Sequence, residues 1–206
     1  MLSSYQIHFE QIADDLAQDG LAIIDAFLIK EEVEGILSLD EFKNHLLQFK
    51  KAGVGASHNL TIKEGIRGDY IRWVDNSNIH PNLEAYFLKL KALISYLNQN
   101  LFLSLKDIEM HLTRYPIGSF YKKHKDQFRS EDHRKISIIL YLNNDWKEEQ
   151  GGQLRIHTEE KICDIFPIAG RLVCMRSDLI EHEVLPATRE RLSVTGWMLD
   201  QFIQMK

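Results

Sequence analysis

His124 and Asp126 form the single His-x-Asp triplet of the chain. In a strand, residues two apart point to the same side, so an imidazole and a carboxylate in this spacing are able to bind one metal ion. By itself the triplet is weak evidence. A solvated histidine beside a surface aspartate, in the polar run KKHKDQ, explains it equally well.

A third candidate ligand, His182, lies in the same half of the chain and precedes the apolar segment RLSVTGWML. Two histidines and one carboxylate form a facial ligand set that leaves positions on iron(II) open for a chelating substrate and dioxygen. Zinc also accepts two histidines and a carboxylate, so these three residues alone do not exclude a zinc hydrolase.

Arg191 follows His182 by nine positions and begins a predicted strand. The alternation of that strand places Arg191 on the same face as Thr195 and Trp197, toward the interior of a barrel. A buried guanidinium costs several kcal/mol unless a carboxylate pairs with it. The distal carboxylate of 2-oxoglutarate is a suitable partner, because a guanidinium binds it through two hydrogen bonds. Arg189 has the same parity, but it belongs to the turn ATRER, which favours a solvated position.

Tyr141 ends another predicted strand, in which Ser137, Ile139 and Tyr141 alternate with apolar residues. Its hydroxyl group is able to donate a hydrogen bond and thereby to complete an anion site beside Arg191. The alternative is an ordinary core tyrosine, and the alternation of the strand fits both.

The elements that position these residues change in character near residue 105. Before it, helical periodicity predicts helices near residues 9–16, 33–47 and 81–97, with a buried strand at 21–27. After it, short segments bounded by turn residues predict strands near residues 109–115, 135–142, 153–157, 171–175 and 191–199. We therefore expect an α+β fold with a mainly β core, closed into a barrel or a two-sheet jelly roll.

Composition favours one soluble domain over residues 1–206, with 1–105 as helical support and 106–200 as the barrel that carries the metal site. The 206 residues are 44% hydrophobic, which is enough for one substantial core. A net charge of -5 disfavours nucleic acid as a partner. No apolar run long enough to span a membrane occurs, the first residues contain no basic leader, and the two cysteines form no CxxC pair. We expect a monomeric, cytoplasmic protein without a membrane partner.

Longer motifs carry a more specific signal than the candidate ligands alone. YLNNDWKEEQGGQLRI contains YLN-x-DW followed by GG-x-LRI, and HEVLPATRERLSVTGW contains HEV-x-PA with an arginine nine residues after the histidine. DGLAIIDAFL, IRGDYIRW and the RYP to FYKKHKD segment extend the match over nearly the whole chain. The chain resembles the 2-oxoglutarate oxygenase superfamily. Within it, the chain is most similar to the prolyl 4-hydroxylases, in particular the catalytic domain of the hypoxia-inducible-factor prolyl hydroxylases.

The resemblance implies a double-stranded β-helix braced by the N-terminal helices, and an enzyme that uses Fe(II), O2 and 2-oxoglutarate, with ascorbate as a further reductant. The substrate it implies is a protein with a proline in an exposed loop. It assigns iron to His124, Asp126 and His182. It assigns the distal carboxylate of 2-oxoglutarate to Arg191 and Tyr141. The pocket around the co-substrate is then formed by Tyr115, Ile139, Leu154, Thr195 and Trp197.

By the same resemblance, residues 62–78 form a mobile loop and hairpin that folds over the bound peptide, with Arg67, Asp69 and Trp73 as substrate-binding residues. A plain surface hairpin with a turn at Gly68 is the alternative. The chain departs from the family pattern in the short stretch PIGSFYKK and in the charged stretch QFRSEDHRK, which flank the entrance. Two other functions stay open: an oxygenase acting on another protein side chain or a small molecule, and a non-catalytic binding or sensing barrel.

Overall fold

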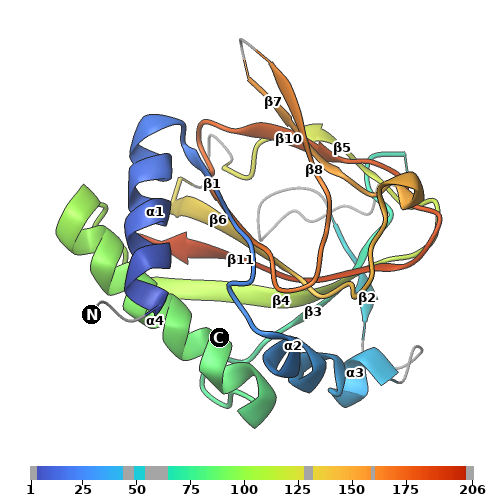
Figure 1. The fold of residues 1–206 in the computed structure, drawn as a ribbon, viewed down its shortest axis with the longest axis horizontal. Coiled ribbons are helices and arrows are strands. Elements are labelled where there is room, and N and C mark those ends of the chain that lie inside the picture. Colours follow the sequence, from blue (N-terminus) through green and yellow to red (C-terminus); the bar gives the residue numbers. More distant parts are fainter. Residues whose placement is uncertain (1–3, 44–48, 54–64, 128–131, 159–160, 203–206) are drawn as a thin grey trace.

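Two antiparallel sheets and a layer of helices make up the structure, a computed structural model that describes residues 4–43, 49–53, 65–127, 132–158 and 161–202 (Figure 1). The larger sheet has seven strands in the order β1 (Leu21–Ile24), β9 (Leu172–Arg176), β6 (Arg134–Tyr141), β11 (Arg191–Leu199), β4 (Asp107–Tyr115), β3 (Tyr70–Trp73) and β2 (Lys50–Lys51). The smaller sheet has four strands in the order β5 (Tyr121–His124), β10 (Glu181–Val184), β7 (Leu154–His157) and β8 (Ile162–Ile165). This is the jelly-roll architecture that the strand pattern predicted.

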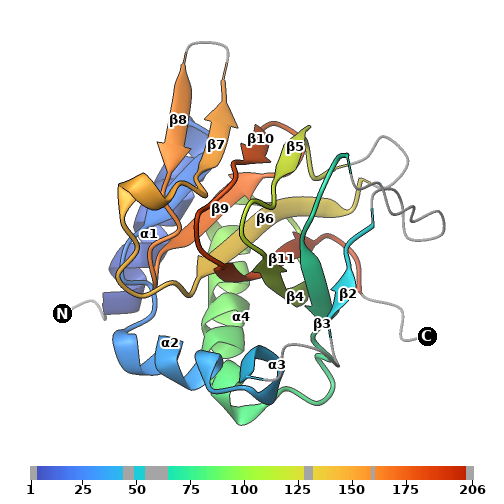
Figure 2. The same ribbon diagram turned by 90° about the vertical axis from the view of Figure 1, so that its right-hand side faces the viewer.

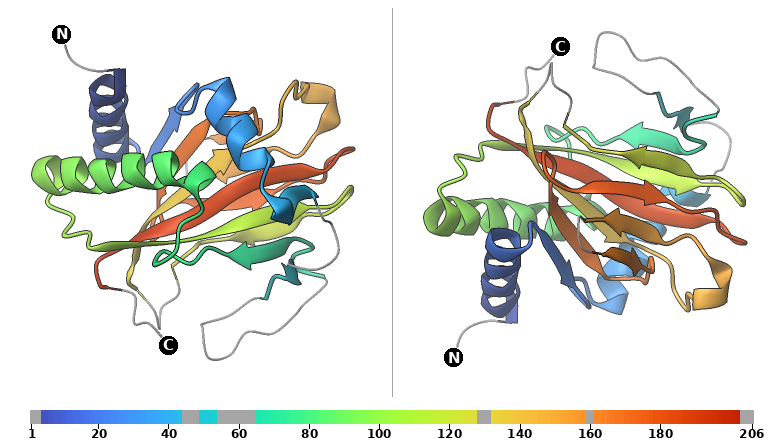
Figure 3. Two further views of the ribbon diagram at one scale, coloured as in Figure 1. Left: turned by 90° about the horizontal axis from the view of Figure 1, so that it is seen from below. Right: turned by 90° about the horizontal axis from the view of Figure 1, so that it is seen from above.

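The helices brace the outer face of the larger sheet, as Figure 3 shows for α1 (Ser4–Gln18) and α4 (Pro81–Leu101). Proline at the first position suits the start of α4, because its missing N–H group has no partner there anyway. The side chain of His80 caps the same end by accepting a hydrogen bond from the backbone N–H group of Asn82. The apolar stripes of both helices pack against the sheet and form a helix-side core with it.

A second, smaller core lies between the two sheets and includes Ile139, Leu154 and Val173. Because its side chains alternate, strand β11 faces the helix-side core on one side and the space between the sheets on the other. Val194 and Met198 belong to the helix-side core, whereas Arg191, Thr195 and Trp197 point into the space between the sheets. That space opens at one end into the pocket described below.

The helical prediction over residues 33–47 is wrong in its extent. Helix α2 covers Lys30–Leu37, and Ser38 caps its C-terminus by donating hydrogen bonds from its backbone N–H group. A separate short helix, α3, covers Asp40–Lys43, and residues 44–48 lie outside the described residues. The strand predicted at 21–27 ends earlier, at Ile24, because Ala26 takes a positive φ of 52° that a strand does not allow.

Three short strands of the smaller sheet, β5, β8 and β10, were not predicted, and neither was β2 of the larger sheet. The three strands of the smaller sheet have four residues each, and together they form most of that sheet (Figure 2). Charged side chains such as Lys123, Asp164 and Glu181 occupy their outer face, where they form ion pairs with neighbouring strands. Strands β5 and β10 therefore contain few apolar residues, and all three strands are too short to show the alternation by which strands are recognised.

The segment predicted to be a mobile loop, 62–78, is part of the sheets over much of its described length. Tyr70–Trp73 forms β3 and pairs with β4. Just before it, Gly68 donates a backbone hydrogen bond to Phe120 (3.0 Å), and Lys122 donates one to Ile66 (2.9 Å). The chain thus runs along the smaller sheet at residues 66–68 and then along the larger sheet at 70–73. Residues 62–64 lie outside the described residues.

Strand β11 offers a test of this packing at Gly196, which lies opposite Met110 of β4 and Ile138 of β6. A Cβ atom at Gly196 would collide with the backbone carbonyl oxygen of Glu109, which is unable to move without disturbing the sheet. We expect Gly196→Ala to lower the free energy of unfolding by about 1–3 kcal/mol, measured by urea denaturation.

Gly35 of α2 is the matched control, because nothing lies within 4 Å of a Cβ atom built there. Gly35→Ala should be neutral or should stabilise the protein by roughly 0.5–1 kcal/mol, since alanine favours a helix. A Gly196→Ala variant as stable as the parent would mean that β11 and β4 are not packed as described.

Candidate active site

The pocket between the two sheets draws its walls from both of them and from the segment before β3. Strands β4, β6 and β11 of the larger sheet form one wall, and strands β5, β7 and β10 of the smaller sheet form the other. Among the residues that line it are His124, Asp126, His182, Arg191, Tyr115, Ile139, Leu154, Thr195, Trp197, Arg67, Asp69 and Trp73. With the exception of Tyr141, every site residue predicted from the sequence therefore faces one cavity.

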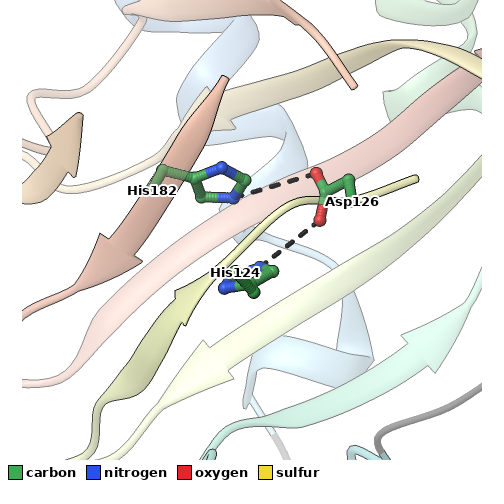
Figure 4. A group of neighbouring side chains, drawn as sticks. All are labelled: His124, Asp126 and His182. Carbon is green, nitrogen blue, oxygen red and sulfur yellow. Dashed lines mark ion pairs between the residues drawn. The ribbon is translucent and has the colours of Figure 1, made fainter. Parts of the chain in front are cut away.

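His124, Asp126 and His182 come together at the smaller sheet (Figure 4). Their nearest ligand atoms all lie within 4.8 Å of one another. The Nε2 atom of His124 is 3.4 Å from one carboxylate oxygen of Asp126, and the Nε2 atom of His182 is 3.8 Å from the other. His182 of β10 is the direct cross-strand partner of His124 of β5, so strand pairing fixes the two imidazoles side by side.

The strand geometry assumed for the His-x-Asp triplet is wrong, because β5 ends at His124 and Asp126 lies in the bend that follows. The backbone turns there and directs the carboxylate between the two imidazoles (Figure 4). The convergence of the three side chains thus depends on the end of the strand as well as on the spacing of the residues.

Backbone carbonyl groups orient both imidazole rings. The Nδ1 atom of His124 is 2.7 Å from the carbonyl oxygen of Lys122, and the Nδ1 atom of His182 is 3.3 Å from that of Ile180. A ring that donates its Nδ1–H group to a carbonyl keeps the lone pair on Nε2. In both histidines this free Nε2 atom faces Asp126, as a metal ligand requires.

Burial and charge set the protonation states that metal binding needs. Burial lowers the pKa of His182 to about 4, so its imidazole is neutral near pH 7. Burial acts to raise the pKa of Asp126, but the two neighbouring imidazoles and a hydrogen bond from Ser137 outweigh it and lower that pKa below its usual range. A neutral imidazole and an ionised carboxylate are the forms that bind a cation.

Arg191 is buried in the opposite wall, with 2% of its surface exposed. Its Nε atom donates a hydrogen bond to the carbonyl of Gly152 (3.1 Å), and one Nη atom donates to the hydroxyl of Tyr141 (3.2 Å). Among the residues that the structure describes, no carboxylate lies within ion-pair distance of this guanidinium. A buried, uncompensated charge that faces a pocket indicates a site for an anionic ligand.

The remaining predicted pocket residues divide into two groups. Tyr141 is fully buried, and its hydroxyl accepts a hydrogen bond from Arg191, which helps to hold the guanidinium in place. Tyr115 does line the pocket, and the guanidinium of Arg191 lies 5.0 Å from the centre of its ring. The apolar and polar wall between Arg191 and the two histidines includes Ile139, Leu154 and Thr195.

An aromatic cluster forms the mouth of the pocket. The ring of His111 meets Trp73 edge-on at 5.0 Å and lies 5.5 Å from Trp197. Arg134 stacks on Trp197 at 3.6 Å, and its Nε atom pairs with Glu109 at 2.7 Å. The indole N–H group of Trp197 is buried without a hydrogen-bond partner in the described part of the chain, so a polar group of a ligand is able to accept from it.

Asp69, predicted to contact the substrate, is fully buried, with 0% of its surface exposed. Its two carboxylate oxygens accept hydrogen bonds from the Nε and Nη atoms of Arg67, at 2.7 and 2.5 Å. Asp69 therefore positions Arg67, which lines the pocket from the side of the smaller sheet. Trp73 fits the prediction better, because it is 49% exposed at the pocket mouth.

Several pocket residues were not predicted from the sequence, among them His111, Tyr121 and Arg134. The alternation of the predicted strand 109–115 places His111 on the same face as Tyr115, so the sequence could have indicated that His111 lines the pocket. Tyr121 gave no signal, because the strand that carries it was not predicted. Arg134 precedes the predicted start of its strand at residue 135, so its direction was not defined.

Iron(II) and 2-oxoglutarate both fit the residues that are present. Two imidazoles and one carboxylate are a donor set for iron that leaves room for a chelating ligand. The uncompensated Arg191 suits the far carboxylate of a dicarboxylic acid. Zinc shares this donor set, so the three ligand residues alone do not decide between the two metals.

Comparisons with known proteins agree with this geometry. Residues 110–199 match the model of the 2OG-Fe(II) oxygenase superfamily. Egl nine homolog 1 of Homo sapiens is 30% identical over 216 residues, which cover 97% of this chain and 48% of that protein. The chain thus spans about half the length of this curated relative.

Two solved structures have the same fold over nearly their whole length. A prolyl-4-hydroxylase of Pseudomonas putida has a TM-score of 0.83 and 37% identity, covering 94% of this chain and 100% of that one. A prolyl hydroxylase of Trichoplax adhaerens, solved with a peptide fragment of the hypoxia-inducible factor, has a TM-score of 0.83 and 26% identity, covering 97% and 94%. The chain therefore belongs to the 2-oxoglutarate- and iron(II)-dependent oxygenases, in their prolyl hydroxylase family.

Proposed function

We propose that the protein hydroxylates a prolyl residue of another protein, consuming O2 and 2-oxoglutarate and releasing succinate and carbon dioxide. The observation that carries this proposal is the placement of Arg191, a buried guanidinium without a carboxylate partner among the described residues, in the same cavity as His124, Asp126 and His182. A co-substrate that bridges Arg191 and the metal needs one carboxylate for the arginine and a chelating end for the metal.

In this proposal, His124, Asp126 and His182 hold iron(II), which together with 2-oxoglutarate supplies the chemistry that inserts one oxygen atom of O2 into a C–H bond. Arg191 binds the distal carboxylate of 2-oxoglutarate, and Tyr141 fixes the guanidinium from behind. Tyr115 and the apolar side chains of Ile139 and Leu154 exclude water from the space between them. The aromatic side chains at the mouth of the pocket then determine which C–H bond of the substrate reaches the metal site.

A proline ring suits this mouth. Trp73, His111 and Trp197 present aromatic rings from three neighbouring strands, and aromatic-lined grooves are the usual surfaces on which proline-containing segments dock. The relatives point the same way: the Trichoplax adhaerens enzyme was solved with a peptide fragment, and the Pseudomonas putida structure is a prolyl-4-hydroxylase. We propose that the substrate is a protein segment with an exposed proline.

The assay that tests this proposal measures succinate formation with and without a candidate protein. Mass spectrometry of the candidate should show the gain of one oxygen atom on a proline, and a Pro→Ala variant of the candidate should not be modified. The oxygen atom on a different side chain would favour the alternative of an oxygenase with another protein target. No succinate under any condition would favour a non-catalytic binding barrel.

Trp73 gives a sharper test of the peptide site. We expect Trp73→Ala to lower the rate of protein hydroxylation about tenfold or more, because a truncated aromatic anchor typically costs well over 1 kcal/mol of binding. The slow decarboxylation of 2-oxoglutarate without protein substrate should stay near the parent rate, since Trp73 touches none of the three ligand residues in the described structure.

Phe102 provides the matched control, because it is an aromatic side chain with 85% of its surface exposed and does not line the pocket. Phe102→Ala should leave both rates unchanged. If Trp73→Ala lowered both rates equally, Trp73 would belong to the catalytic machinery and the proposed peptide site would be wrong.

We further propose that the protein acts as a cytoplasmic monomer. Both cysteines, Cys163 and Cys174, are free, which suits a reducing compartment. In the described residues, no helix is long and apolar enough to cross a membrane. Size-exclusion chromatography with light scattering tests the monomer.

A further inference from the structure

Three side chains form a stack that runs from residues 66–69 to the candidate metal site. The phenol ring of Tyr121 lies parallel to the imidazole of His124, with ring centres 3.6 Å apart and an angle of 18° between the planes. On its other side, the guanidinium of Arg67 lies 4.2 Å from the centre of the Tyr121 ring. Tyr121 is thus held between a metal-ligand candidate and a residue of the segment that borders the pocket mouth.

The outer end of the stack is firmly attached to residues 66–69. Arg67 forms a two-point ion pair with the buried Asp69 and also donates a hydrogen bond to the carbonyl of Gly53 (3.2 Å). Backbone hydrogen bonds join Gly68 to Phe120 and Lys122 to Ile66, so residues 66–68 close onto β5 beside Tyr121. If this segment moved away from β5, Arg67 would leave the ring of Tyr121.

We infer that Tyr121 is a positioning residue that couples metal binding at His124 to the closure of residues 66–69 onto β5. The inference rests on the proposed function, because it takes the metal site as given. A metal bound to Nε2 fixes the plane of the His124 imidazole, and the plane of Tyr121 is then fixed by stacking. Aromatic and cation–π contacts are favourable only over a narrow range of positions, so an ordered Tyr121 favours an ordered Arg67.

Coupling of this kind is reciprocal. If metal binding favours closure of residues 66–69, closure must strengthen metal binding by the same factor. A bound protein substrate that holds this segment closed would therefore tighten the iron site before the reaction begins. This places a control of metal affinity at the substrate entrance, on residues that do not bind the metal themselves.

The test uses Co(II) as the probe ion, because it accepts the same ligands as iron(II) and its binding is visible by absorbance. Hydrogen exchange reports the closure of the segment at the amides of Gly68 and Lys122, which donate its two hydrogen bonds to β5. In the parent protein, saturating Co(II) should slow exchange at both amides about fivefold or more, the lower end of typical couplings.

Tyr121→Leu removes the ring and should abolish this metal-dependent slowing while weakening Co(II) binding by about the same factor. Tyr121→Phe is the matched control, since the hydroxyl of Tyr121 has no hydrogen bond in the described structure and the stack needs only the ring. Tyr121→Phe should keep both the slowing and the affinity. Equal slowing by Co(II) in the parent and in Tyr121→Leu would overturn the inference.

Arg67→Lys breaks the stack from the other end without leaving Asp69 buried and unpaired, because lysine keeps the charge but lacks the planar guanidinium. Arg67→Lys should also reduce the slowing of hydrogen exchange by Co(II). It therefore tests the coupling even if Tyr121→Leu fails to fold. His182→Ala distinguishes an error in the metal site from an error in the proposed coupling. If Co(II) binds the parent no better than His182→Ala, the metal site is wrong; if it binds but slows neither amide, only the coupling is wrong.

Discussion

His182→Ala is expected to abolish succinate formation from 2-oxoglutarate while leaving a folded protein. His182 is one of three side chains that converge on a single point, and its Nε2 atom faces the carboxylate of Asp126 at 3.8 Å. Loss of a direct ligand should lower metal affinity by more than the roughly 10- to 100-fold that loss of an outer-shell partner costs. Anaerobic titration with Fe(II), together with a succinate assay, measures both effects.

His157 supplies the control for that experiment. It lies on β7, next to β10, and pairs with Glu183 at 3.0 Å on the outer face of the smaller sheet. Exposed ion pairs of this kind contribute about 0–1 kcal/mol, so His157→Ala should retain activity and metal affinity within about threefold. Full activity in His182→Ala would remove the metal assignment altogether.

Arg191→Met should raise the 2-oxoglutarate concentration needed for half-maximal activity by roughly thirtyfold or more. Truncating one partner of a buried charge pair costs about 2–5 kcal/mol, and 1.4 kcal/mol corresponds to about a factor of ten. Methionine keeps much of the volume of the side chain and removes its charge. In a thermal-shift assay, 2-oxoglutarate should raise the melting temperature of the parent protein but not that of the variant.

Arg189→Met is the matched control for Arg191. Arg189 is only partly buried; it donates a hydrogen bond to the carbonyl of Asn144 (3.2 Å) and lies 5.0 Å from the ring of Trp146, away from the pocket wall. Its replacement should change the response to 2-oxoglutarate by less than about threefold. The reverse order of effects would show that the co-substrate binds at the edge of the sheet rather than between the sheets.

Strand β11 shows what the sequence was able to predict. Its nine residues alternate regularly, so the pattern predicted its limits and the interior direction of Arg191, Thr195 and Trp197. The rival Arg189 lies outside the strand, as the turn residues around it indicated. Where one face of a long strand packs against an apolar core, the alternation of apolar and polar residues specifies its register, and this alternation is visible in the sequence.

Short strands and contacts distant in sequence were not predictable in this way. Tyr121 and Arg67 are 54 positions apart, and nothing local to either indicates that they stack. The family resemblance implied that Asp69 contacts the substrate; its burial depends on Arg67, two positions earlier, folding back onto it. These features arise from how the segment crosses between the sheets, which no periodic pattern encodes.

The division of the interior into two cores has a consequence for how such an enzyme diversifies. Most of the helix-side core has no contact with the pocket, so it is able to supply stability while residues at the mouth change. Substitutions at Trp73, His111 or Arg134 alter the shape of the pocket that a substrate meets, and they leave the stability supplied by the helix-side core unchanged. New target proteins are therefore accessible through a few exchanges at the pocket mouth, whereas β11, which serves both the helix-side core and the pocket, is expected to tolerate the least change over evolutionary time.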